Sequence, residues 1–201
     1  MRSEGPKADH RSTSRRDGRI LAVVTDATTT LSTRFAAPDD AERIHRIVEA
    51  AYRAKGEGAG WTTESGILDG QRTDLREISE LIANPDGGLL TLREDDRIVA
   101  TCQLERRSDH AYFGMFAVDP AAQAHGLGKY LLSEAGRVGR EEWGLSQMRL
   151  TVIAARTDLI AWYERRGFRP TGATSPFPYG DERFGIPRVE GLHFVEFSMD
   201  L

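Results

Sequence analysis

Apolar residues recur at helical spacing in four stretches of the chain, and this spacing predicts four amphipathic helices. The first helix follows a turn at residues 38–40 and has its apolar face at Ile44, Ile47, Val48 and Ala51. The second is expected at about residues 73–83 and the third at about 126–143. The fourth is expected at about residues 158–166, where Gly167 ends it.

Alternating or continuous apolar runs predict seven strands. The runs cover residues 31–35, 89–93, 98–105, 111–118, 148–153, 168–171 and 193–199. The run at 111–118 is apolar on both faces, which is typical of a strand in the centre of a sheet. A turn at Asp95 and Asp96 joins the two runs around it into an antiparallel hairpin. The order β-α-α-β-β-β-α-β-α-β-β predicts one α/β domain with a mixed sheet and helices on both faces.

The first 26 residues are expected to form a disordered tail. They hold six basic and four acidic side chains and almost no apolar residue before Ile20. Such a composition buries too little apolar surface to offset the entropy of ordering. We therefore expect the folded domain to span residues 27–201.

The amino-acid composition limits the classes of protein to which this chain can belong. The chain has 201 residues, a net charge of −4 and a single cysteine, Cys102. We expect no nucleic-acid partner because there is no basic excess, and no membrane partner because no apolar run approaches the roughly 18 residues of a spanning helix. We expect no metal either, a buried and inert Cys102, and a cytoplasmic location by default. The oligomeric state stays open, a homodimer included.

The segment between the predicted central strand and the third helix carries the most specific chemical signal. Gly126 and Gly128 let backbone N–H groups approach an anion, and the helix that begins there directs the positive end of its dipole toward it. The segment is not a P-loop, because GxxxxGK[ST] requires Gly at Gln123 and Ser or Thr at Tyr130. It is not the dinucleotide fingerprint either, because Leu131 occupies the third glycine position.

The spelling Q-x-x-G-x-G, formed by Gln123, Gly126 and Gly128, resembles the pyrophosphate loop of the GNAT superfamily of N-acetyltransferases. Further along, Y-x-x-x-G-F beginning at Tyr163 resembles the second common signature of that family. The resemblance covers roughly residues 31–201. It implies a GNAT-type fold, with a mixed, mostly antiparallel central sheet and helices on both faces in a single domain.

The resemblance also implies the reaction and the cofactor site. An acetyl group would pass from acetyl-CoA to a primary amine by direct attack in a ternary complex. A backbone N–H near Phe116 would polarise the thioester oxygen, and Tyr163 would protonate the departing thiolate. The residues implied in binding acetyl-CoA are Phe116, Ala117, Val118, Gln123, Ala124, His125, Gly126, Leu127, Gly128 and Lys129. Many family members have Asn where this chain has Arg156, so the contact of that Asn with the cofactor arm is in doubt, and the arginine can instead reach solvent or a phosphate.

The acceptor amine must lose a proton before it attacks, because a protonated amine has no lone pair. Glu105, at the end of the third strand, is the predicted general base by topology, and a water chain is the alternative. Trp61, Glu64 and Asp181 are predicted to contact the acceptor.

These contacts predict a small, cationic or neutral primary amine held between residues 56–70 and 175–188. If acidic acceptors are the better substrates, Arg183 or Arg188 is the expected anchor.

Two other functions stay open. A CoA-binding regulatory module without catalysis is one, and the presence of Tyr163 counts against it. A protein or peptide N-acetyltransferase is the other, and competition between peptides and small amines distinguishes it.

Overall fold

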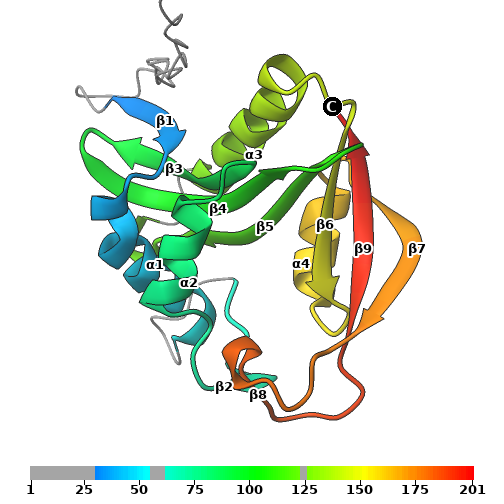
Figure 1. Ribbon diagram of the computed structural model, residues 1–201. Helices are drawn as coiled ribbons and strands as arrows, with labels where there is room; N and C mark the ends of the chain where they lie inside the picture. The colour runs from blue at the N-terminus through cyan, green and yellow to red at the C-terminus, as the bar shows by residue number, and fades with distance from the viewer. Residues whose placement is uncertain (1–29, 55–61, 123–125) are drawn as a thin grey trace, which may run out of the picture.

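The protein is built on a seven-stranded sheet with helices on both faces (Figure 1). The computed structural model describes residues 30–54, 62–122 and 126–201. The strands are ordered β1-β3-β4-β5-β6-β9-β7, and all neighbours are antiparallel except β5 and β6. Their bounds are β1 Leu31–Phe35, β3 Gly87–Glu94, β4 Arg97–Arg106, β5 Ala111–Val118, β6 Gln147–Ile153, β7 Arg169–Pro176 and β9 His193–Asp200. The predicted mixed, mostly antiparallel sheet is confirmed.

Two helices, α1 (Ala41–Arg53) and α2 (Leu75–Ile82), cover one face of the sheet. The side chain of Asp74 caps α2 by accepting a hydrogen bond from the backbone N–H of Glu77 at 2.7 Å. The buried cluster on this face contains Ile44, Ile47, Val48, Ala51, Tyr52, Ile78, Leu89, Ile98, Met115 and Ala117. The predicted apolar face of the first helix is confirmed.

The other two helices, α3 (Leu127–Arg137) and α4 (Thr157–Glu164), pack on the opposite face with the larger core. Its fully buried rings belong to Phe113, Phe116 and Phe168. The helix α4 ends at Glu164, two residues before the predicted end, and its C-cap is Arg165. Gly167, whose φ is 99°, then turns the chain so that Phe168 enters this core.

The third helix is shorter than predicted. Regular α-helix ends at Arg137, and one π-helical turn, Val138–Glu142, follows it. Gly139 lies in this turn, and a Cβ there would come within 2.8 Å of Leu201 Cδ1. The turn thus lies against the last residue of the chain, a contact between distant segments.

A second, two-stranded sheet joins segments that are far apart in the sequence. Its strands, β2 (Leu68–Asp69) and β8 (Ile186–Pro187), were not predicted. The backbone N–H of Arg188 adds a hydrogen bond of 2.9 Å to the carbonyl of Ile67. The two segments from which the acceptor site is predicted therefore lie side by side (Figure 1).

Cys102 lies on β4 with no exposed surface, inside the larger core. Burial raises the pKa of its thiol. The predicted buried thiol is confirmed.

The predicted tail at residues 1–26 lies outside the described residues, so the domain boundary stays a prediction. Among the helices of the described ranges, none is long and apolar enough to cross a membrane.

Candidate active site

The central strand β5 separates from β6 and opens the middle of the sheet. The two strands pair at residues 111–112 and 148–149, whereas β5 runs on to Val118 and β6 to Ile153. Figure 1 shows them diverging from a common end. The divergence leaves room for a ligand between two central strands, where the sheet is otherwise closed.

A β-bulge shapes β5 at this opening. The register with β4 shifts between Thr101 and Gln103, and Met115 has a φ of 42°. A bulge bends a strand and changes the direction of its side chains. Just after it, the hydroxyl of Tyr52 donates a 3.0 Å hydrogen bond to the carbonyl of Phe116, which ties α1 to the bulged strand.

A cavity of about 420 Å³, here called the α3 cavity, lies where α3 begins. Gly126 precedes the helix with a φ of 73°, and within the described ranges, its chain neighbours aside, no heavy atom lies within 4 Å of where its Cβ would stand. The lining residues are Val118, Ala122, Gly126, Leu127, Gly128, Lys129, Asp158, Trp162, Arg165 and Arg166. A helix N-terminus together with three cationic side chains makes this cavity suited to an anion such as a phosphate.

Sequence reasoning missed two cations of the α3 cavity, Arg165 and Arg166. The guanidinium carbon of Arg166 lies 3.4 Å from the centroid of the Trp162 ring, and its Nη1 donates to the Trp162 carbonyl at 2.8 Å. Burial and the charge of Arg165 lower the pKa of Arg166. Two adjacent cations at the end of a helix are also common as partners of the helix dipole, so the pair gave no specific signal in the sequence.

A second cavity, of about 210 Å³ and here called the β5 cavity, is lined by other residues of β5 and α4, the strand and helix that also line the first. Phe116 on β5 and Tyr163 on α4 line it, while Val118 and Trp162 of these elements line the α3 cavity. Its polar lining comes from Tyr52, Glu64, Arg72, Tyr112, Thr151 and Tyr163, and its apolar lining includes Leu68, Leu159, Phe177, Phe184 and Phe194.

Tyr163 is held by edge-on ring contacts and lines the β5 cavity. Its ring centroid lies 5.1 Å from that of Trp162 and 5.4 Å from that of Phe168. Within the described part of the chain its hydroxyl makes no hydrogen bond. Burial raises the pKa of Tyr163 well above its usual 10.0. The hydroxyl is therefore protonated at neutral pH and can donate a proton inside the cavity.

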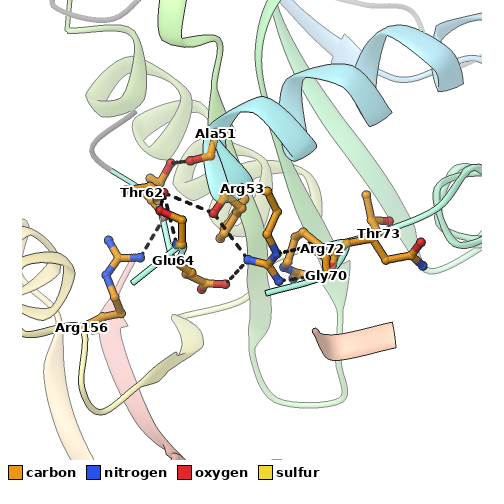
Figure 2. A network of polar contacts seen from close by, with 12 residues as sticks. Ala51, Arg53, Thr62, Glu64, Gly70, Arg72, Thr73 and Arg156 are labelled. Atoms are coloured by element: carbon orange, nitrogen blue, oxygen red, sulfur yellow. Dashed lines mark hydrogen bonds and ion pairs between the residues drawn. The ribbon is translucent and has the colours of Figure 1, made fainter. Parts of the chain in front are cut away.

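Glu64 also lines the β5 cavity, but its charge is balanced by the protein (Figure 2). Arg53 Nη1 lies 2.8 Å from Glu64 Oε2, and both side chains are about nine-tenths buried. The same guanidinium donates to the carbonyls of Gly70 at 3.1 Å and Gln71 at 3.3 Å. Because Glu64 is already paired, it adds no net negative charge for a cationic acceptor.

Arg156, at the position where the family often has Asn, is buried and holds the loop after α1. Its Nη1 donates a 2.9 Å hydrogen bond to the carbonyl of Thr62 (Figure 2). Its Nε and Nη2 donate to the carboxylate of Asp158 at 3.1 and 3.2 Å. Of the two expected destinations, solvent is excluded by burial, while contact with a phosphate stays a prediction. The guanidinium joins α4 to the loop that carries Glu64.

We expect Arg156→Met to lower the free energy of unfolding by about 1–3 kcal/mol, because the buried Thr62 carbonyl loses this donor. Denaturant unfolding monitored by circular dichroism measures the change. Arg76→Met is the matched control, since the Arg76 side chain is 85% exposed and pairs with Glu80 on the surface; its effect should stay within about 0.5 kcal/mol. Equal losses in both variants would contradict the role given to Arg156.

The predicted base, Glu105, lies one strand away from the β5 cavity and is not part of its described lining. It stands opposite Tyr112 in the β4–β5 register. Gln103 Nε2 donates to its Oε1 at 2.7 Å, and Arg107 forms an ion pair with its other oxygen. These two partners hold the carboxylate outside the described lining of the cavity.

The structure places some of the other predicted site residues in the two cavities and others outside them. Gly126, Leu127, Gly128, Lys129 and Val118 line the α3 cavity, and Phe116 lines the β5 cavity. Ala117 points its side chain into the α1–α2 cluster, so only its main chain faces the opening. Asp181 does not belong to the described lining of the β5 cavity, although Phe177 and Phe184 from the same segment do. Trp61, Gln123, Ala124 and His125 lie outside the described residues.

Comparison with known proteins identifies a family whose members this chain resembles. The model of the acetyltransferase (GNAT) family matches residues 42–168. A mycothiol acetyltransferase from Segniliparus rotundus is 29% identical over 144 residues, which cover 67% of this chain and 50% of that protein. The chain thus spans about half the length of this relative.

Solved structures show the same fold at low sequence identity. The ribosomal-protein-S18-alanine N-acetyltransferase from Escherichia coli superposes with a TM-score of 0.62 at 18% identity, covering 85% of this chain and 94% of that one. The PaiA N-acetyltransferase from Thermoplasma acidophilum in complex with coenzyme A gives 0.59 at 15% identity, covering 86% and 99%.

Proposed function

Because the chain belongs to the GNAT acetyltransferase family, we propose that it transfers an acetyl group from acetyl-CoA to a primary amine of a small molecule, in a direct ternary complex. One observation carries the proposal: neighbouring residues of β5 and α4 line two cavities, one suited to an anion and the other lined by a protonated tyrosine. Direct transfer needs these two subsites in contact, because the amine must reach the thioester without a covalent enzyme intermediate.

The α3 cavity fits the pyrophosphate of acetyl-CoA. The open space at Gly126 leaves the N-terminus of α3 accessible, and Lys129, Arg165 and Arg166 supply positive charge around it. The divergence of β5 from β6 gives the pantetheine arm a path toward Phe116. When bound, acetyl-CoA supplies the thioester that the amine attacks.

Within the β5 cavity, Tyr163 serves as the general acid. Its hydroxyl stays protonated and gives its proton to the sulfur when the thiolate leaves. A backbone N–H of the bulged strand near Phe116 polarises the carbonyl oxygen of the thioester.

A small acceptor suits the β5 cavity better than a folded protein surface does. Its volume is about 210 Å³, and the β2–β8 ladder joins the two segments beside it. The mycothiol acetyltransferase relative, by its name, also acts on a small molecule. The Escherichia coli structure, by its title, acts on a protein, so a peptide carrying a free N-terminus belongs in the test.

The test incubates the full chain with acetyl-CoA and a panel of primary amines, alcohols and short peptides, and identifies products by mass spectrometry and NMR. We expect an amide product and one CoA released per amide formed. Acetylated alcohols alone would overturn N-acetyl transfer, and preferential acetylation of peptides would overturn the small-molecule acceptor.

Glu105 is the general base of this proposal, acting through water. We expect Glu105→Gln to lower kcat by about 10²-fold at pH 7 and to recover as the pH approaches the pKa of the amine, where no base is needed. Glu64→Gln, which removes the partner of Arg53 in the cavity lining, should change KM without this recovery of kcat at high pH. A pH-rate profile of each variant separates the two roles, and an unchanged kcat in Glu105→Gln at pH 7 would remove Glu105 from the mechanism.

A further inference from the structure

Among the charged side chains that line the β5 cavity, Arg72 stands out because its charge has no partner. Glu64, the carboxylate of this lining, is paired with Arg53 at 2.8 Å. Within the described ranges, the guanidinium of Arg72 forms neither an ion pair nor a hydrogen bond, and it lies over the ring of Tyr52 with its central carbon 5.2 Å from the centroid. Of the two charged side chains in the described lining, Arg72 is therefore the one without an ion pair.

The backbone of Arg72 is fixed from two sides. On one side the carboxylate of Glu49 accepts hydrogen bonds from the N–H groups of Arg72 at 2.6 Å and Thr73 at 2.9 Å. On the other, Arg53 binds the carbonyls of Gly70 and Gln71, the two residues before it (Figure 2). A short loop is thus fastened to α1 at four main-chain groups, which reduces the entropy cost of holding a ligand at the side chain.

The surroundings keep the guanidinium charged and direct it inward. Burial alone lowers the pKa of Arg72, but Tyr52, Glu64 and Glu77 outweigh it, so the pKa lies above its ordinary value. Tyr52, on which Arg72 stacks, also donates to the Phe116 carbonyl at the β5 bulge. One aromatic ring therefore separates the free cation from the strand beside which the transfer is proposed to occur.

We propose that the acceptor amine also carries an anionic group and that Arg72 binds this group, so that amino acids, rather than cationic amines, are the acceptor class. The inference rests on the proposed function, since it specifies the acceptor of that site. A guanidinium forms a bidentate pair with a planar carboxylate and also binds phosphate. Two alternative anchors were expected, Arg183 and Arg188. The side chain of Arg183 lies outside what the structure describes, whereas Arg188 is not in the described lining of the cavity and is already bonded to Ser65 and Asp69.

The experiment compares acceptors with and without the anion, and the Arg72 variants control for the lower amine pKa of the esters. Several α-amino acids are measured against their methyl esters, and phosphoethanolamine against ethanolamine, in the full chain and in Arg72→Gln, Arg72→Lys and Arg188→Gln. We expect kcat/KM to favour the carboxylate over the ester by about 10- to 150-fold, the range of a hydrogen bond to a charged group. Arg72→Gln should bring this ratio close to one, Arg72→Lys should restore part of it, and Arg188→Gln should retain it.

Three outcomes would overturn the proposal: equal use of acid and ester by the unaltered protein, a ratio that survives Arg72→Gln, or a ratio lost in Arg188→Gln. Preference for phosphoethanolamine alone would keep Arg72 as the anchor and replace carboxylate by phosphate as the ligand. A binding measurement separates this proposal from the proposed function. If no amine is acetylated, acetyl transfer fails, whereas thermal stabilisation by an N-acetyl amino acid, absent with its ester and absent in Arg72→Gln, still supports the anion site.

Discussion

Replacing Tyr163 by phenylalanine is expected to lower kcat by about 10²- to 10⁴-fold while the affinity for acetyl-CoA stays the same. The substitution removes the hydroxyl of a residue that lines the β5 cavity but keeps the ring against Trp162 and Phe168. Steady-state kinetics with saturating acceptor measures kcat, and isothermal titration with acetyl-CoA measures binding.

Tyr130→Phe is the matched control, because Tyr130 lies on α3 and is not among the described residues that line either cavity. A loss below about threefold in Tyr163→Phe would mean that solvent or another group protonates the thiolate. The raised pKa of Tyr163 also predicts the pH dependence of the unaltered protein. Because the hydroxyl of Tyr163 keeps its proton, kcat should not fall below about pH 10 through deprotonation of this residue.

The second large effect is expected at the start of α3. Acetyl-CoA at 100 times its Kd should stabilise the protein by about 2.7 kcal/mol, which corresponds to a rise of about 5–11 °C in Tm. Gly126→Glu should abolish this rise, because it places a negative charge and a side chain at the helix end that is proposed to bind the pyrophosphate. Differential scanning fluorimetry with and without acetyl-CoA measures both values.

Backbone strain has to be separated from the effect on the cofactor. Gly172 on β7 has a φ of 87° and, like Gly126, no heavy atom of the described ranges within 4 Å of its Cβ position, its chain neighbours aside. Gly172→Glu therefore introduces the same residue at a similar strained conformation, away from the α3 cavity. It should lower Tm but retain the rise with acetyl-CoA, and a rise that persists in Gly126→Glu would refute the binding site.

The elements that the sequence predicts well are those in which a local pattern agrees with its final environment. The bounds of β1 and β5 match their predictions, since β5 is apolar on both faces and ends at Asp119 and Pro120. The strands β2 and β8 could not be predicted from a local pattern. Each has two residues, and their reason to be extended is a partner more than a hundred positions away.

In the site too, residues that belong to a local sequence motif were predicted, whereas residues that depend on distant partners were not. The glycine loop and Tyr163 were predicted because their spacing is a signature within one stretch of sequence. The functions inferred for Arg72 and Arg156 depend on what lies opposite them: Arg72 is free because Arg53 has taken Glu64, and Arg156 is occupied because Thr62 offers a carbonyl. Such roles depend on which side chains and carbonyls lie close together in the folded protein, and a local sequence motif does not contain this information.

The buried Cys102 has a practical consequence for following the reaction. Each turnover of the proposed reaction releases one CoA thiol, which a disulfide dye can count continuously. The chain contains a single cysteine, and its sulfur is shielded and protonated in the folded protein. The native enzyme therefore adds no background to such an assay and needs no added reductant. In strong denaturant the same sulfur becomes one reactive group per chain, so dye uptake before substrate is added reports the unfolded fraction of a preparation.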